Sequence, residues 1–326
     1  GYDACSGELF FDAPQPGHAT DCARYLIAKR VLYRILDGNG DGVIDARDEG
    51  GHRARLGFWT FSTTNRRQRD IGQPHAAIWC GGSACSGLEP TVYSGDNTVL
   101  YWTDSRQEKQ RVAGNTALAG CLEAVKPYLD DHRRADAYRS CRKKFVILVT
   151  DGQDTLSCDG SGSSDQPDQY KRRRASVLRV KALRDAGYRV FVIGLGNNNM
   201  PAYQQYTLNW MARHGGTENP LAKKSGDPSA LNPGAFTSNP CAWSPTSGSC
   251  SGSSDQCFAA TSDPGAIPLS GYAFLAGNAM ELETALRAAM TPIRDASYAF
   301  GTPSVSAART AGEDYLYAAS FVPGGA

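Results

Sequence analysis

The chain has 326 residues, of which 41% are hydrophobic and 21% are charged, and its formal net charge is +1. This length is sufficient for one large α/β domain with insertions or for two small domains. The nearly neutral charge gives no electrostatic reason to expect nucleic acid or an anionic membrane as a partner. No apolar run approaches the ~20 residues that a membrane-spanning helix needs, so no membrane span is expected.

Ten cysteines are the clearest indication of the compartment, and none of them forms a C-x-x-C pair. Zinc ribbons and thioredoxin-like redox sites therefore have no support. The even number of cysteines and their positions in loops favour disulfides, and hence an exported protein. Three pairings are reasonable, although the spacing leaves the connectivity open: Cys80 with Cys85, Cys5 with Cys22, and Cys121 with Cys141.

The first predicted element is a helix that begins at Thr20 or Asp21 and ends near Leu36, because apolar residues recur at helical spacing. It leads directly into an Asp-, Asn- and Gly-rich segment, residues 37–48, which has the pattern of a calcium-binding loop. The expected Ca²⁺ ligands are the side chains of Asp37, Asn39, Asp41, Asp45 and Asp48 and the backbone carbonyl of Val43.

Two features qualify the predicted calcium loop. Gly42 stands at position 6, where the loop turns sharply, but position 12 is Asp48 instead of the glutamate of an EF-hand. An aspartate there resembles the dockerin version of the loop, and Glu49 is an alternative ligand one residue later. Gly50 and Gly51 stand where an exit helix would begin, which favours a structural clamp over a switching sensor. A chance Asx-rich turn is the alternative interpretation.

The residues Phe145–Val149 are consecutive apolar residues, and they predict a strand that is buried on both faces, as in a parallel sheet. The run stops at Thr150-Asp151-Gly152, so Asp151 lies at the carboxyl end of the strand, where open α/β sheets bind ligands. The alternative is that Asp151 only caps the following segment. Further strands are expected at 55–62, 97–102, 188–196 and 272–276, and helices at 117–129, 169–186, 201–214 and 279–293.

The alternation of strands and helices places residues 1–296 in one α/β domain with two insertions, at 63–90 and 218–268. The second insertion is rich in Pro, Ser, Gly and Asn and contains three cysteines, which predicts a disulfide-tied surface segment. Residues 297–326 carry two strand-like patterns outside the alternation. They predict a short C-terminal β extension.

The order of these motifs resembles a von Willebrand factor A (vWA) domain. The matching residues are Gly114-Asn115-Thr116, Thr150-Asp151-Gly152, the strand ending in Gly194-Leu195-Gly196, and Gly215-Gly216-Thr217. Such domains have a doubly wound, mainly parallel, Rossmann-like sheet, and a metal-ion-dependent adhesion site at its carboxyl edge. The resemblance implies that Thr116 and Asp151 bind Mg²⁺ or Ca²⁺ there.

The first motif of that adhesion site, Asp-x-Ser-x-Ser after a hydrophobic strand, is absent from its expected place. Residues 159–163 spell the motif, but they follow a polar segment and are interpreted as a chance match. Leu9–Asp12 is an alternative strand, although the residues after it lack both serines. We therefore expect this strand and its motif to precede Gly1.

The resemblance narrows to PilY-type proteins, which are type IV pilus biogenesis factors and tip adhesins. Residues 1–14 resemble the segment after their metal motif, and residues 297–321 resemble the start of their C-terminal β-propeller. This implies an exported, calcium-binding adhesion or assembly module at the pilus tip or cell surface. Its partners would be minor pilins or other tip components, and a host or surface ligand that carries a carboxylate.

Two other functions remain as alternatives. The first is a purely structural stalk or cap domain whose adhesion site is not functional. The second is a metal-dependent hydrolase that uses Asp151 and Asp154, but this lacks an evident base. The five histidines are scattered without metal-ligand spacing, so no enzyme is expected.

A basic stretch, Lys171–Arg174, continues into Arg179, Lys181 and Arg184 on one predicted helix. Such a charge run is most often a solvated helix face. A binding surface for an anionic polysaccharide, nucleic acid or a pilin is the alternative interpretation.

Overall fold

The computed structural model describes residues 28, 31–32, 34–41, 58–61, 72–76, 116–140, 142–158, 169–196, 200–235 and 263–296. Several predictions concern other residues and lie outside this part of the chain: the strand at 97–102, the motif-like residues 159–163, the extension at 297–326, the pairings of Cys80 with Cys85 and Cys5 with Cys22, and the loop residues Val43, Asp45 and Asp48.

The main sheet consists of β3 (Phe145–Thr150), β4 (Arg189–Leu195) and β5 (Phe274–Ala276), in the order β3-β4-β5. All three strands are parallel, and Phe145 lies opposite Arg189 while Thr150 lies opposite Gly194. The parallel pairing agrees with the continuous apolar run that predicted β3. All three carboxyl ends therefore lie at one edge of the sheet.

Helices connect and cover these strands: α4 (Leu118–Ala135), α5 (Gln169–Asp185), α6 (Ala202–His214) and α7 (Ala279–Ala296). A short 3₁₀ helix spans Pro233–Ala235. These four helices confirm the predictions at 117–129, 169–186, 201–214 and 279–293, although α4 extends past its predicted end at Leu129. Among the described helices, none is long and apolar enough to cross a membrane.

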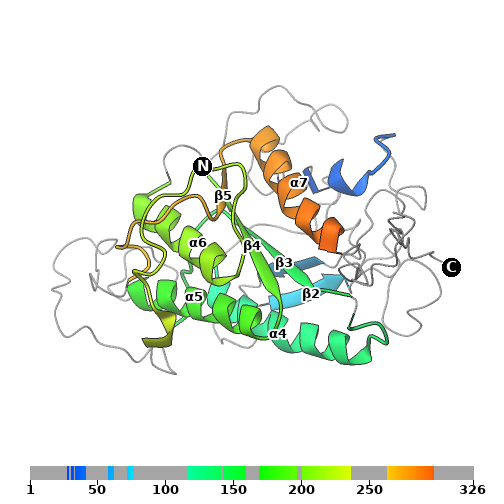
Figure 1. Cartoon of the computed structure of the whole chain (residues 1–326), viewed down its shortest axis with the longest axis horizontal. Helices are drawn as coiled ribbons and strands as arrows, with labels where there is room; N and C mark the ends of the chain where they lie inside the picture. Colours follow the sequence, from blue (N-terminus) through cyan, green and yellow to red (C-terminus); the bar gives the residue numbers. More distant parts are fainter. Residues whose placement is uncertain are drawn as a thin grey trace, which may run out of the picture.

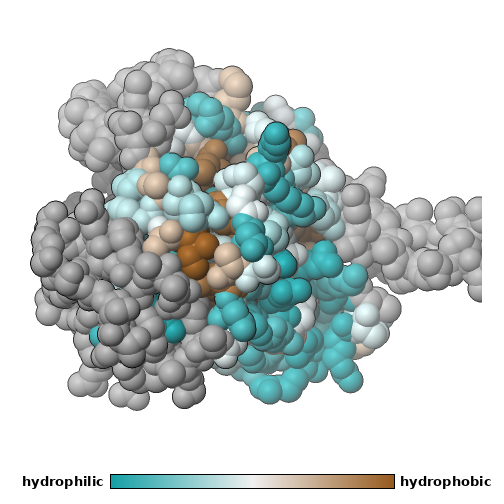
Figure 2. All heavy atoms as spheres, turned by 60° about the vertical axis from the view of Figure 1, so that its left-hand side comes forward, coloured by the Kyte–Doolittle hydropathy of each residue, from teal (hydrophilic) through white to brown (hydrophobic). Residues whose placement is uncertain are grey.

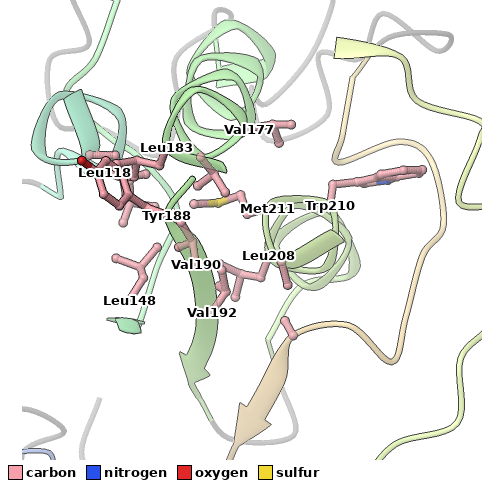
Figure 3. Close-up of a cluster of buried hydrophobic side chains, with 14 of the residues drawn as sticks. Leu118, Leu148, Val177, Leu183, Tyr188, Val190, Val192, Leu208, Trp210 and Met211 are labelled. Atoms are coloured by element: carbon pink, nitrogen blue, oxygen red, sulfur yellow. The ribbon is translucent and has the colours of Figure 1, made fainter. Parts of the chain in front are cut away.

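Strand β4 divides the core into two layers because its side chains alternate between the faces of the sheet. Val190 and Val192 join a cluster with buried residues of α4, α5 and α6 (Figure 3). Phe191 and Ile193 point the other way, into a cluster that includes Val31 and residues of α7. Helices therefore cover both faces of the parallel sheet (Figure 1), and the arrangement is consistent with a Rossmann-like α/β fold.

A separate two-stranded sheet is formed by β1 (Phe58–Phe61) and β2 (Gly72–Ala76), which pair antiparallel. β1 confirms the strand predicted at 55–62, and β2 lies inside the segment expected to be an insertion. The ring of Trp59 packs edge-on against Tyr128 of α4, with ring centroids 5.3 Å apart. The hairpin thus contacts α4.

Helix α5 corrects the prediction of a solvated basic face. Arg172, Arg173 and Arg174 are each only 1% exposed, whereas Arg184 near the helix end is exposed. For Arg173 the physical reason is a tertiary partner, because its guanidinium forms a buried ion pair with Asp263, 2.7 Å between Nη2 and Oδ2. The first half of α5 is therefore covered.

The described cysteines differ in their bonding. Cys121 lies buried in the first turn of α4 as a free thiol, so the pairing of Cys121 with Cys141 was wrong. Burial raises the pKa of the Cys121 thiol to about 12, which makes it unreactive at neutral pH. Cys158 is disulfide-bonded, and its partner lies outside the described residues.

Apolar side chains on the described surface are scattered. The large exposed ones are Tyr138, Leu221, Leu275 and Met280, which come from separate segments. Figure 2 shows hydrophilic residues over most of the described part of one face, with small hydrophobic areas between them. Single exposed apolar residues of this kind do not by themselves mark an interaction surface.

His214 ends α6 in an environment that disfavours its charged form. Its ring stacks on Trp210, with centroids 5.7 Å apart, and the indole N–H of Trp210 donates to the carbonyl of Ile267. Burial, followed by the nearby cations Arg213, Arg184 and Lys181, lowers the pKa of His214 from 6.5 to about 4.

This environment predicts a pH-dependent component of stability. As the pH falls below about 6.5, the unfolded chain binds a proton at His214 before the folded chain does, so stability is lost until the pH reaches about 4. The loss between about pH 7 and pH 4.5 is at most ~2.5 kcal/mol, and less because the ring is partly exposed. The change His214→Gln should remove this component in urea unfolding at both pH values. Identical pH profiles for the two proteins would contradict the prediction.

Candidate functional site

Asp151 lies exposed at the carboxyl end of β3, the position that its sequence context predicted. The turn around it is fixed by Thr150, whose hydroxyl donates to the carbonyl of Gly152 (2.9 Å) and accepts from its N–H (3.2 Å). From α6, the side-chain amide of Gln204 donates to the backbone carbonyl of Asp151 at 3.2 Å. The backbone is held while the carboxylate faces solvent.

Thr116 lies at the same edge of the sheet because it is hydrogen-bonded to Thr155, four residues after Asp151. Its N–H donates to the Thr155 hydroxyl (2.8 Å), and its carbonyl accepts from the Thr155 N–H (2.7 Å). These bonds use only backbone atoms of Thr116, so its hydroxyl is not consumed by them. The structure thus joins the segment that carries Thr116 to the loop that carries Asp151.

Asp154 joins the first turn of α4 to the loop after β3, a role that was not predicted from the sequence. Its Oδ2 accepts from the N–H of Ala119 (2.7 Å) and the hydroxyl of Ser157 (2.6 Å). Its Oδ1 accepts from the N–H groups of Leu156 (3.0 Å) and Ser157 (2.7 Å). Asp154 therefore supplies the amino-terminal cap of α4, although it lies 35 residues from Ala119 in the chain.

The carboxylate of Asp154 is buried, and its protonation reflects competing effects. Burial raises its pKa, and the hydrogen bonds from Ser157, Ala119 and Leu156 partly offset that rise by favouring the charged form. Because both oxygens are already hydrogen-bonded within the protein, Asp154 holds the loop together and does not present itself to a ligand. A hydrolytic centre that used Asp154 would have to break these hydrogen bonds.

The next layer beneath Asp151 is a buried polar network. Gln153 donates to Gln169 at 2.6 Å, between Nε2 and Oε1. The Nη1 of Arg173 lies 3.2 Å from the side-chain oxygens of both glutamines. The same guanidinium forms two further bonds to Asp263, at 2.9 and 2.7 Å. Both residues that follow Gly152 are thus anchored in the interior.

The described part of the predicted calcium loop, Asp37–Asp41, forms a tight turn of oxygen-bearing side chains. Oδ1 of Asp37 accepts from the N–H groups of Gly40 (2.9 Å) and Asp41 (3.1 Å). Oδ1 of Asn39 accepts from the N–H of Asp41 at 2.8 Å. Gly40 has a φ of +74°, a conformation that glycine adopts without strain. Three of the six predicted ligands therefore lie in one turn, in which Asp37 is half-buried and Asn39 and Asp41 are exposed.

The donor chemistry of both places suits a hard cation. Carboxylate, amide and hydroxyl oxygens are typical ligands of Ca²⁺ and Mg²⁺, and neither place offers the sulfur or imidazole that softer metals prefer. Within the described residues, no group of three or more His, Cys, Asp or Glu side chains is close enough to hold a metal ion. Thr116 and Asp151 fit an incomplete site, to which further ligands would have to be added.

Comparison with known proteins adds no assignment. No protein-family model matches the chain, and neither a curated protein nor a solved structure shows significant similarity to it. Function is therefore inferred from the residues themselves.

The two acidic residues of the loop should differ sharply in their contribution to stability. Asp154→Ala leaves three buried backbone N–H groups and one hydroxyl without their acceptor, and it removes the cap of α4. We expect a loss of about 2–4 kcal/mol in the free energy of unfolding. Asp151→Ala is the matched control, because this side chain is exposed, and it should change stability by less than about 0.5 kcal/mol. Urea unfolding at neutral pH measures both, and equal values would refute the assigned roles.

Proposed function

We propose that this chain is an exported, calcium-binding vWA-type module that mediates adhesion or assembly at the tip of a type IV pilus. The observation that carries the proposal is the junction at the carboxyl edge of the sheet. There the loop with Asp151 and the segment with Thr116 are joined through Thr155 and Asp154. Ligands of open α/β sheets bind at this edge.

The chemistry of the edge fits binding better than catalysis. Asp151 contributes an exposed carboxylate and Thr116 contributes a hydroxyl, and further oxygen ligands would complete the set, as in the domains that the sequence resembles. A Mg²⁺ or Ca²⁺ ion bound there would offer an open coordination position to a carboxylate of the partner. Minor pilins, other tip components, or a host ligand are the proposed partners.

The loop at Asp37 has a different proposed role, as a calcium-dependent clamp. It directly follows the helical segment whose residues Val31 and Ile35 are buried in the core beside α7. Asp37 itself is half-buried, and the residues after it are exposed. Calcium at this position would fix the exit of the helix. A static clamp of this kind needs no hinge and no exit helix.

A structural stalk or cap without a working adhesion site is the second candidate. One observation favours it: among the described residues, no group of three or more His, Cys, Asp or Glu side chains lies close enough to hold a metal ion. Under this alternative, the same network around Asp154 would serve only to stabilise the domain.

Replacing Asp151 distinguishes the two candidates. In the background Asp41→Ala, which removes the calcium loop from the measurement, Asp151→Ala should weaken Mg²⁺ binding more than about tenfold, because a direct or water-mediated ligand is lost. Isothermal titration calorimetry of the chain gives the affinity, and Asp227→Ala, another exposed aspartate, is the control. An unchanged Mg²⁺ affinity would reject the adhesion site, and the structural stalk or cap would be the remaining candidate.

The clamp is tested by Asp41→Ala in an otherwise unchanged chain. A ligand that binds only the folded state stabilises it by about 2.7 kcal/mol at a hundredfold excess over its dissociation constant. Calcium should therefore raise the Tm of the parent chain, and the variant should lose most of that increase. Asp227→Ala is again the control, because its carboxylate also caps an exposed turn, at Ser229. An equal calcium response in all three proteins would disprove the clamp.

A further inference from the structure

The buried pair of Arg173 and Asp263 lies under the loop that carries Asp151. Arg173 is 1% exposed and Asp263 is fully buried. The guanidinium donates in parallel from Nε to Oδ1 (2.9 Å) and from Nη2 to Oδ2 (2.7 Å). This two-point geometry fixes the plane of the guanidinium as well as its position.

The packing around the guanidinium leaves little freedom for it to move. A Cβ atom at Gly265 would lie 2.7 Å from Nε of Arg173, so the backbone approaches the side chain as closely as glycine allows. The N–H of Gly265 donates to Oδ1 of Asp263 at 2.8 Å. From α6, the ring of Tyr203 lies with its centroid 5.4 Å from Cζ of Arg173. The pair is therefore held from two segments besides α5.

The fixed guanidinium reaches the loop through Gln153. Its Nη1 donates to Oε1 of Gln153, and the amide of Gln153 donates to Gln169 in the first turn of α5. Gln153 is buried, and it lies two residues after Asp151 and one residue before the anchor Asp154. The backbone on the other side is held by Gln204, which donates to the carbonyl of Asp151.

These hydrogen bonds hold the backbone around Asp151 in place, while the Asp151 carboxylate itself is exposed. A buried ion pair contributes little net stability compared with well-packed apolar residues, but it sets the direction of each donor and acceptor. Residues that hydrogen-bond to a metal ligand and orient it commonly affect the affinity of the site for the metal.

We propose that Asp263 and Arg173 are positioning residues for Asp151: their ion pair fixes Gln153, and Gln153 fixes the loop that presents the carboxylate. The proposal rests on the proposed metal site, whose ligand it concerns. Through Arg173 and Gln153, the segment around Asp263 would then set the Mg²⁺ affinity of the proposed site at Asp151.

The experiment uses the 326-residue chain with Asp41→Ala and Mg²⁺ as the ligand. Calorimetry measures the affinity, and hydrogen exchange is followed in the peptide that contains residues 150–154. Asp263→Asn should weaken Mg²⁺ binding by about 10- to 100-fold and speed exchange in that peptide. Gln153→Ala breaks the link but keeps the ion pair, so it tests the same idea if Asp263→Asn folds poorly. Because both changes interrupt one link, the double variant should bind no more weakly than the weaker single variant.

Asp136→Asn is the matched control. Asp136 is also a buried acid, paired with Lys144 and Arg142, but Lys144 immediately precedes β3 and so lies at the opposite end of that strand. It should destabilise the fold without changing Mg²⁺ affinity or exchange at residues 150–154.

The outcomes separate this inference from the proposed function. If Asp151→Ala lowers Mg²⁺ affinity but Asp263→Asn and Gln153→Ala do not, the positioning role is overturned and the metal site stands. If Asp151→Ala has no effect, the metal site fails, and hydrogen exchange decides the positioning role. Faster exchange at 150–154 in Asp263→Asn, but not in Asp136→Asn, then supports the link, and unchanged exchange overturns it.

Discussion

The carboxylate of Asp154 is the contact on which the carboxyl edge of the sheet depends. It brings the first turn of α4 against the loop after β3, so two segments that are distant in the chain become one surface. Thr155 and Gln153 flank Asp154 in the chain. Thr155 is hydrogen-bonded to Thr116, and Gln153 is hydrogen-bonded to Arg173. A buried carboxylate is costly unless it is well hydrogen-bonded, and the four donors around Asp154 explain how it is tolerated.

Much of the fold was predictable because apolar spacing is a local property. The apolar runs at β3 and β4, and the helices expected before, between and after them, identified the elements of the described core. The end of α4 was less predictable, because its last turns are polar and gain support from contacts that periodicity does not record. Asp130, for example, accepts hydrogen bonds from Lys126 at 2.6 Å and from the hydroxyl of Tyr188, also at 2.6 Å.

The candidate site was predictable only in part, for the same reason. The position of Asp151 follows from the end of an apolar run, which a single sequence displays. The buried state of Arg173 does not, because its partner Asp263 lies 90 residues later in a polar segment with no regular pattern. Asp154 was equally hidden, since nothing in Gln153-Asp154-Thr155 distinguishes a buried cap for a distant helix from an ordinary polar loop.

The division of the core by β4 also has a consequence for the order of folding. The layer with α4, α5 and α6 is built mostly from one continuous stretch of chain, between Leu118 and Ala212. The opposite layer joins α7 to the helical segment around Val31, and its ion pair between Arg34 and Glu283 spans 249 residues. Closing a long loop costs entropy before any contact is gained. The first layer can therefore assemble early, while the second has to wait for both ends of the described chain to meet.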